Sequence, residues 1–430
     1  MDDMNRDRHY ALIVNNSYMD DDLYYLNEFC ALVKVIGLEV FVCTAQKVEV
    51  PNPSTYIGKG MVEYIKNIIS DLNNESEHLK DNIVVVTNFP LTGTQRYNLE
   101  KKIGVPVVDR HYIILKIFEL NAHSVEAKLQ VDIASLTWSK NHLINKEGAF
   151  SQVTSGGGLH NKGSGEKKIA LDRRKIERMI NVKKEELERI KLARRNSRNK
   201  RNNSGEYKVA VVGYTNAGKS TLINGLINYA NGSKEKEVLV KDQVFATLET
   251  STREIAKFGN LKFLITDTVG FVSNLPTTLV NAFRSTLEEV KEADLIIHVV
   301  DVSDEKKEEQ IKVTQDVLNE IGVSDIPTIY LYNKYDLLKD KPTKLLSNDS
   351  LYCSLINNND IEEIYHFILS NLAKNWKKEE LLIPYEEDYA SFSSNNYIYK
   401  MRQNKNGYEC TVYLNPRTLY KFNYLLDKNS

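Results

Sequence analysis

The residues best placed to do chemistry form a glycine-rich loop that ends in a lysine and a serine. An apolar run, Val209–Val212, precedes the loop, and a helix-compatible run, Leu222–Tyr229, follows it. This strand–loop–helix order is that of a phosphate-binding P-loop. We expect its backbone N–H groups to bind phosphate oxygens, Lys219 to reach the β- and γ-phosphates, and Ser220 to ligate Mg²⁺. A glycine turn in an ordinary βα unit is the alternative. The nucleotide-binding residues predicted here are Gly213, Tyr214, Thr215, Asn216, Ala217, Gly218, Lys219, Ser220 and Thr221.

A second segment is predicted to hold the metal and the terminal phosphate. The apolar strand Leu261–Thr266 ends in Asp267-Thr268-Val269-Gly270. A carboxylate at that strand end can hold a Mg²⁺-bound water, and the Gly270 N–H can face the γ-phosphate.

A threonine-rich stretch, residues 242–253, lies between these two segments. It should contain the loop that closes on Mg²⁺ and the γ-phosphate, and we favour Thr247, within Phe245-Ala246-Thr247, as its ligand. Thr250 and Thr252 are alternatives that spacing does not separate, and a Thr-rich strand at a sheet edge is the competing interpretation. The predicted metal ligands are therefore Ser220, Thr247 and Asp267, and the predicted catalytic residues are Lys219, Thr247 and Gly270.

The base that the site reads is predicted from the end of a later strand. Pro327–Tyr332 is followed by Asn333-Lys334-Tyr335-Asp336, a pattern that reads guanine. The Asp336 carboxylate can accept from guanine N1–H and the 2-amino group, which adenine does not offer, and Asn333 is expected at the other purine edge. A weaker base-lining segment is predicted at Cys353-Ser354-Leu355. The predicted ligands are therefore GTP and GDP with Mg²⁺.

One residue carries a prediction about rate. Phe271 follows Gly270 at the place where Ras-like enzymes have the glutamine that orients the attacking water. A phenyl ring forms no hydrogen bond with water, so we expect slow intrinsic hydrolysis that a partner stimulates. Plain core packing of Phe271 is compatible with this interpretation.

Composition limits the classes of protein to consider. The 430 residues carry a net charge of −1, so no global field indicates a nucleic-acid partner. Four scattered cysteines indicate a reducing cytoplasm and argue against a zinc site or a disulfide framework. We expect no membrane span and no signal peptide. We expect a monomer.

The elements that must position these residues are predicted to be of the α/β class. We expect an N-terminal parallel α/β domain plus an antiparallel helical hairpin, then a P-loop GTPase (G) domain with a small C-terminal α+β module. The predicted bounds are 1–121 for the α/β subdomain, 122–196 for the hairpin, 197–206 for a basic linker, 207–375 for the G domain and 376–430 for the C-terminal module.

The predicted hairpin is the strongest candidate for an RNA-binding element. Its second helix has an apolar seam and carries many Lys and Arg residues, and a glycine-rich tip, residues 155–165, joins the two helices. By charge alone this is a solvated helix face. A projecting basic hairpin also suits an RNA crevice, where phosphate contacts dominate affinity.

A second glycine–lysine loop, Tyr56-Ile57-Gly58-Lys59-Gly60, precedes an N-terminal helix. It has the composition of an anion-binding loop for RNA phosphate or a second nucleotide. A glycine turn with a solvated lysine explains it equally well.

Taken together, these motifs resemble the HflX family of ribosome-associated GTPases. Gly213–Thr221, Phe245–Leu248 and Asp267–Phe271 match that family's three phosphate-side motifs, hydrophobic Phe271 included. Upstream, the similarity extends through residues 56–174, including Gln130–Ala134 and Asp172–Arg174, and so covers most of the chain. The resemblance implies a cytoplasmic GTPase that binds the large (50S) ribosomal subunit and its rRNA and can split or rescue stalled ribosomes.

Two other functions stay open. One is a nucleotide-gated switch for ribosome binding in which hydrolysis is incidental. The other is a ribosome-assembly or RNA-linked GTPase that shares only the central domain, although the matching residues 56–174 argue against it.

Overall fold

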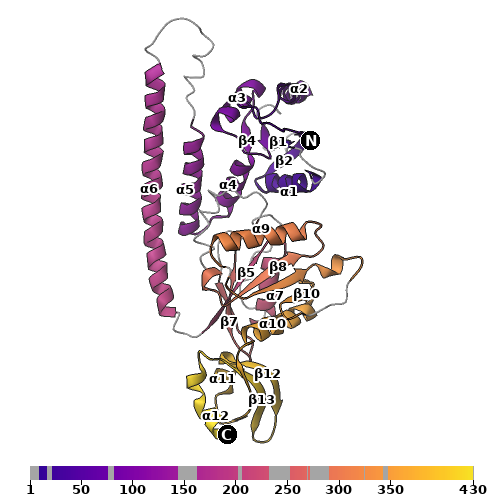
Figure 1. Cartoon of the computed structure of the whole chain (residues 1–430), viewed down its shortest axis with the longest axis vertical. Helices are drawn as coiled ribbons and strands as arrows, with labels where there is room; N and C mark the ends of the chain where they lie inside the picture. The colour runs from indigo at the N-terminus through magenta and orange to yellow at the C-terminus, as the bar shows by residue number, and fades with distance from the viewer. Residues whose placement is uncertain are drawn as a thin grey trace, which may run out of the picture. The chain divides into compact units, whose positions relative to one another are not determined.

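The computed structural model describes residues 9–16, 22–75, 82–143, 162–201, 206–231, 252–268, 270–271, 290–323, 325–341 and 347–429. The chain divides into two compact units (Figure 1). The first contains Met1–Lys191, and the second contains Leu192–Leu275 and Phe283–Ser430.

The first unit begins with the parallel α/β fold that the sequence predicts. Four parallel strands lie in the order β2-β1-β3-β4. They are β1 (His9–Asn16), β2 (Leu38–Gln46), β3 (Ile83–Thr87) and β4 (Val107–Asp109), and they alternate with α1 (Asp22–Val35), α2 (Lys59–Glu75), α3 (Gly93–Ile103) and α4 (Arg110–Asn121). Local caps fix the ends of the helices. Thr92 and Gln95 form a capping box at the start of α3, and Asp109 accepts from the Tyr112 N–H at the start of α4.

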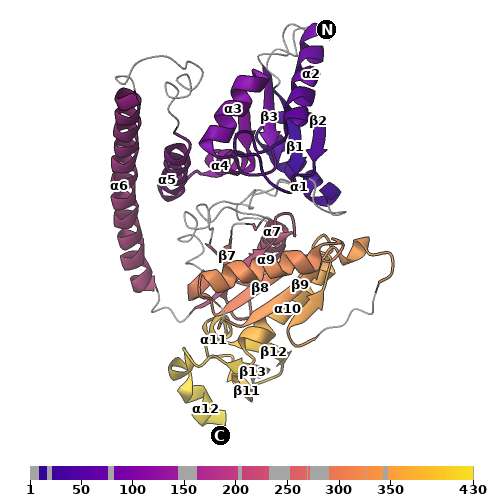
Figure 2. The ribbon, with the colours of Figure 1, turned by 45° about the horizontal axis from the view of Figure 1, so that its top comes forward.

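The helical hairpin consists of α5 (Val125–Asn141) and the long α6 (Lys162–Arg201), which run side by side in Figures 1 and 2. Lys183 pairs with Asp132 at 2.6 Å, and Glu177 pairs with Lys140 at 2.9 Å. Residue numbers therefore rise along α5, from Asp132 to Lys140, while those of their partners on α6 fall, from Lys183 to Glu177. The two helices are antiparallel, as predicted.

Helix α6 ends at Arg201, inside the range predicted as a linker from residue 197. The predicted start of the linker, at residue 197, is therefore wrong. Residues 197–201 are polar and basic but contain no glycine or proline, and Arg and Lys are good helix formers.

The second unit is built on a six-stranded sheet with the order β10-β9-β8-β5-β7-β6, in which only β6 runs antiparallel to its neighbour. Its strands are β5 (Tyr207–Gly213), β6 (Thr252–Ile255), β7 (Phe263–Asp267), β8 (Leu295–Asp301), β9 (Thr328–Asn333) and β10 (Ser350–Tyr352). The helices are α7 (Lys219–Asn231), α9 (Lys307–Glu320) and α10 (Asn358–Leu372), with short 3-10 helices η3 (Val290–Glu292) and η4 (Tyr335–Leu337).

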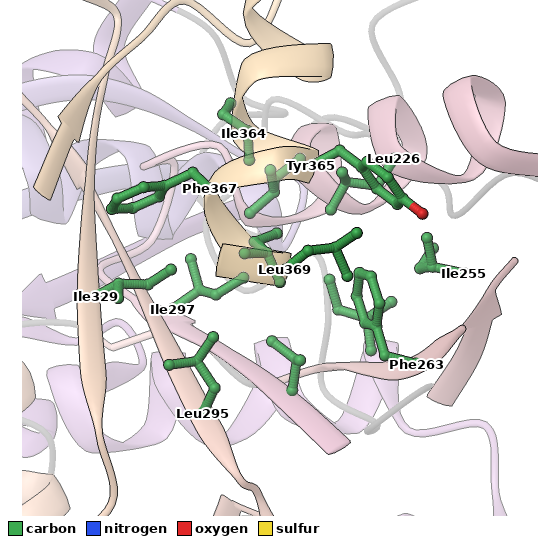
Figure 3. Packing of buried hydrophobic residues seen from close by; sticks show 14 of the residues in the cluster. Leu226, Ile255, Phe263, Leu295, Ile297, Ile329, Ile364, Tyr365, Phe367 and Leu369 are labelled. Carbon is green, nitrogen blue, oxygen red and sulfur yellow. The ribbon is translucent and has the colours of Figure 1, made fainter. Parts of the chain in front are cut away.

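The G-domain core lies between one face of this sheet and helices α7 and α10. Tyr365 and Leu369 of α10 pack with Leu226 of α7 over Phe263 and Ile297 of the strands (Figure 3). Burying apolar side chains here fixes β5 in the interior of the sheet, and the P-loop starts at the C-terminal end of β5.

The C-terminal module is a three-stranded antiparallel sheet of order β11-β13-β12, with α11 (Tyr389–Asn395), η5 (Leu419–Lys421) and α12 (Asn423–Asn429). Strands β12 (Tyr397–Gln403) and β13 (Gly407–Leu414) form an antiparallel β-hairpin within the predicted α+β module. Strand β11 (Lys377–Pro384) begins with four charged residues, so the sequence gives no strand signal at its start. The module is fastened to the G domain by two hydrogen bonds between the Asn260 side chain and the Ile398 backbone, at 3.1 and 3.2 Å.

Among the described residues, no helix is long and apolar enough to span a membrane.

Candidate nucleotide-binding site

The loop between β5 and α7 has the backbone of a phosphate-binding loop. Gly213, Asn216 and Gly218 have φ values of 148°, 61° and 108°. A Cβ at Gly213 would lie 2.3 Å from the Val299 carbonyl oxygen, and one at Gly218 would lie 2.4 Å from Asn333 Nδ2. Only glycine fits at these two positions, so the sequence motif is enforced by contacts with β8 and β9.

Lys219 is buried at the bottom of this loop. Its ammonium donates to the Gly213 carbonyl at 3.1 Å and to the Tyr214 carbonyl at 2.8 Å. Burial lowers the pKa of Lys219 to about 8, although Asp267 acts in the opposite direction. A cation held in a low-dielectric pocket attracts a polyphosphate strongly, and the phosphate in turn raises the lysine pKa.

Two oxygen donors meet beside Lys219. The Ser220 hydroxyl lies 3.2 Å from Asp267 Oδ2, and Asp267 is fully buried at the end of β7. Thr268 anchors the turn that follows, because its hydroxyl donates to the Val211 carbonyl at 2.6 Å. A hydroxyl and a carboxylate at this spacing are the hard oxygen ligands that suit Mg²⁺.

Phe271 is tied to the P-loop by its backbone. Its N–H donates to the Gly213 carbonyl at 3.2 Å, and its carbonyl accepts from the Thr215 N–H at 2.8 Å. Its side chain is 4% exposed. Gly270 is equally confined, because a Cβ there would lie 2.8 Å from Thr215 Cγ2 and 3.0 Å from Lys219 Nζ.

Asn333 connects the two ends of the site. Its Nδ2 donates to the Ala217 carbonyl at 2.8 Å, and its Oδ1 accepts from the Leu355 N–H at 3.0 Å. The side chain therefore braces the P-loop against the Cys353–Leu355 segment, a role that spacing did not reveal. Its contact with the purine stays a prediction.

The structure brings the predicted base reader and the weak base-lining segment together. Ser354 donates from its hydroxyl to Asp336 Oδ1 at 2.6 Å, and the Tyr335 N–H donates to the Cys353 carbonyl at 3.1 Å. Lys334, in a left-handed conformation with φ of 63°, pairs with Asp301 Oδ2 at 2.6 Å. One Asp336 oxygen is thereby oriented by a short hydrogen bond, which prepares the carboxylate for a donor-bearing base edge.

Comparison with known proteins identifies the family. Residues 24–119 match a family described as "GTP-binding GTPase N-terminal", residues 121–201 one described as "GTP-binding GTPase Middle Region", and residues 208–334 one described as "50S ribosome-binding GTPase". Over 387 residues the chain is 38% identical to the GTPase HflX of Caldanaerobacter subterraneus subsp. tengcongensis, covering 90% of this chain and 86% of that protein. The chain belongs to the HflX family of GTPases.

A further curated relative agrees with this assignment. The GTPase HflX of Escherichia coli is 34% identical over 321 residues, or 75% of this chain and 71% of that one. A GTP-binding protein from Sulfolobus solfataricus, solved in complex with GDP, is 22% identical with a TM-score of 0.45, covering 85% of this chain and 99% of that one. As an HflX GTPase, the protein binds guanine nucleotide and converts GTP and water to GDP and phosphate.

Part of the predicted site lies outside the described residues. These are Phe245, Ala246, Thr247, Val269 and the alternative Thr250. Thr252, the other alternative, lies on edge strand β6, where its hydroxyl is 3.0 Å from that of Thr266. The rest of the threonine-rich stretch, residues 242–251, lies outside the described residues, so the choice between a metal ligand and a strand edge stays a prediction.

Two residues beside the site were not predicted. Asp301, at the end of β8, could have been found as a carboxylate that ends an apolar strand. His298 gave no such signal: it lies on β8 in register with Val212, and burial, with the Lys219 charge second, lowers its pKa to about 4. An uncharged imidazole therefore lies near the P-loop lysine at neutral pH.

Proposed function

We propose that this HflX GTPase binds the large (50S) ribosomal subunit through its helical hairpin, and that ribosome-stimulated GTP hydrolysis serves to split or rescue stalled ribosomes. The protein would act as a monomer in the cytoplasm, where ribosomes work. The matched family description "50S ribosome-binding GTPase" supports the partner.

The distribution of charge on α6 is the observation that carries this proposal. Ile180 and Leu187 are buried, whereas the basic side chains of residues 173–178 are exposed: Arg173, Arg174, Lys175 and Arg178. Acidic residues of α6 gather further along, at Glu185, Glu186 and Glu188. Basic residues nevertheless outnumber acidic ones in both halves of α6. The exposed basic side chains of residues 173–178 therefore belong to a helix that is positively charged along its length, which suits contact with RNA phosphates.

Mg²⁺ is the cofactor that the phosphate end of the site fits. Ser220 and Asp267 would hold the ion, directly or through water, and Thr247 is proposed as the ligand that closes over it. When bound, the ion neutralises charge on the β- and γ-phosphates. The protein supplies the remaining charge with Lys219 and fixes the loop through Gly213 and Gly218.

Phe271 supports the dependence on a partner. Its backbone is hydrogen-bonded to the P-loop and its ring is buried, so this position offers no group to orient water. The ribosome would complete the site by supplying or ordering the missing group, which makes hydrolysis slow off the ribosome and fast on it.

Co-sedimentation with separated ribosomal subunits tests the partner. We expect binding to the large subunit with a non-hydrolysable GTP analogue and weaker binding with GDP. Replacing Arg173, Arg174 and Lys175 with Glu should weaken binding at least about tenfold and reduce the slope of log K against log salt by roughly 2–3. The matched control reverses three scattered exposed lysines, Lys312, Lys374 and Lys405. Equal loss in both variants would contradict a specific role of α6.

The nucleotide-gated switch remains the second candidate, and the buried Phe271 favours it. Single-turnover hydrolysis with and without large subunits separates the two. Acceleration supports the first proposal, and an unchanged rate with intact GTP-dependent binding supports the switch.

A further inference from the structure

Two cysteines that are 13 positions apart in the sequence lie side by side in the N-terminal α/β fold. Cys30 lies on α1 and Cys43 on β2, and their Sγ atoms are 3.7 Å apart. Both are free thiols. A change in strand register brings them together. Ala11 pairs with Val40 but Leu12 pairs with Val42, so Phe41 is an additional residue and Cys43 lies beside Ile13. Without that shift Val42 would lie there instead, and Cys43 would face the other side of the sheet.

The two thiols differ in their surroundings. Cys43 is exposed on edge strand β2, whereas Cys30 is partly buried. Burial raises the pKa of Cys30 to about 11, the neighbouring Cys43 adds to the rise, and Lys34 acts against it. Because Cys43 is exposed, oxidants in the solvent reach it first. The raised pKa keeps Cys30 in its thiol form at neutral pH, so it reacts after Cys43 has been oxidised.

We propose that Cys30 and Cys43 form a reversible dithiol–disulfide site that is oxidised by hydroperoxides. The site is independent of the nucleotide pocket and of the proposed ribosome binding.

The reaction balances in two steps. Cys43 Sγ attacks a peroxide oxygen, the O–O bond breaks, and the products are a Cys43 sulfenic acid and water. Cys30 Sγ then attacks Cys43 Sγ, the S–O bond breaks, and a second water leaves as the S–S bond forms. Two thiols lose two electrons and two protons, and one hydrogen peroxide becomes two waters. Thiol–disulfide exchange with an external dithiol reverses the oxidation.

A soft-metal site is the other chemistry that two thiols offer. Within the described part of the chain, however, no group of three or more His, Cys, Asp and Glu side chains is placed to hold a metal ion. Two sulfur ligands alone fall short of the four that a structural zinc site uses.

Trypsin makes the test direct, because cleavage after Arg8, Lys34 and Lys47 places the two cysteines in different peptides, 9–34 and 35–47. The reduced full-length protein is treated with one equivalent of hydrogen peroxide, alkylated, and digested without reductant. We expect the two peptides to be joined, free thiols measured after denaturation to fall from four to about two per chain, and dithiothreitol to restore them. The crosslink should also raise the Tm of the N-terminal fold by about 5 °C, since it restricts the unfolded chain.

Two variants separate this mechanism from general oxidation. In Cys30→Ser, Cys43 should accumulate as a sulfenic acid that dimedone traps, whereas Cys43→Ser should lose thiols far more slowly than the unmodified chain. GTP hydrolysis in both variants should match that of the unmodified protein. Separate alkylated peptides after oxidation, crosslinks only between chains, or tight zinc binding by the reduced protein that the variants abolish would each overturn the proposal.

Discussion

Two glycine–lysine loops in this chain begin helices of parallel α/β folds, yet only one has the structure of a phosphate site. In the N-terminal loop, Lys59 is exposed, and the amide of Gly58 donates to Gln46 Oε1 at 3.0 Å. The amide of Tyr56 donates to the Asn52 carbonyl at 2.8 Å, so the turn uses these donors internally. In the G-domain loop, Lys219 is buried and held by two carbonyl oxygens.

The difference teaches what makes such a loop functional. The two loops share their composition, but only the G-domain loop has a buried cation and glycines that close contacts require. A Cβ at Gly60 would meet nothing within 4 Å, and one at Gly58 would meet only the end of the Gln46 side chain, at 3.0 Å. A Cβ at Gly218 would lie 2.4 Å from Asn333 Nδ2, in a left-handed backbone. A loop that satisfies its own amides and leaves its lysine in water has little to offer a phosphate.

The largest expected effect comes from removing the buried cation. Lys219→Ala should weaken GTP binding about 100-fold or more, because charge-assisted hydrogen bonds to the phosphates are lost. The matched change Lys59→Ala should leave the affinity within about twofold. Calorimetry with Mg²⁺ measures both, and a comparable loss in the two variants would erase the distinction between the loops.

The glycine contacts give the next largest difference. Gly218→Ala should weaken GTP binding about tenfold and lower Tm, because the added methyl meets Asn333 Nδ2 and the backbone is left-handed. Gly60→Ala lies in the first turn of α2 with open space around it, so Tm should stay the same or rise. Thermal unfolding of both variants, with and without GDP, provides the measurement.

The pH dependence sharpens the same contrast. Burial lowers the pKa of Lys219 to about 8, so the ammonium that binds phosphate is present below that pH and is lost above it in the empty site. The Kd for GTP should therefore rise above pH 8, by up to about tenfold per pH unit, until the pKa of the bound state is reached. Titrations with a fluorescent GTP analogue between pH 7 and 9.5 test this. A flat profile in the unmodified protein, equal to that of Lys219→Ala, would show that the lysine does not titrate as described.

The smallest expected effect on GTP affinity concerns the guanine-reading segment around Asp336, which has no counterpart beside the N-terminal loop. Ser354→Ala removes the hydroxyl that orients Asp336, and GTP affinity should fall about fivefold with ATP affinity unchanged. Competition binding measures the ratio. An equal loss for both nucleotides would mean that Ser354 supports the loop rather than the reading of guanine.

Much of this fold was predictable because local patterns and tertiary structure agree. The apolar run Val209–Val212 lies within β5, and Pro327–Tyr332 overlaps β9. Ile180 and Leu187 of the predicted apolar seam are buried on α6. The P-loop and Asp336 were predictable because nucleotide chemistry dictates their residue types and spacing.

What the sequence hid depends on contacts between distant segments. The Asn333 brace joins Ala217 to Leu355 across three elements, and the Cys30–Cys43 contact depends on a register shift at Phe41. Polar composition predicts a linker from residue 197 and gives no strand signal at residues 377–380, yet α6 extends to Arg201 and four charged residues begin β11.

The central claim is that one pocket of this HflX GTPase, in the G domain, recognises guanine nucleotides. Calorimetric titration of the full chain with GTP and with ATP, in the presence of Mg²⁺, tests it most directly. The account predicts one GTP per chain and ATP binding at least about 100-fold weaker. Equal affinity for the two nucleotides, or a second GTP bound with similar affinity, would contradict it.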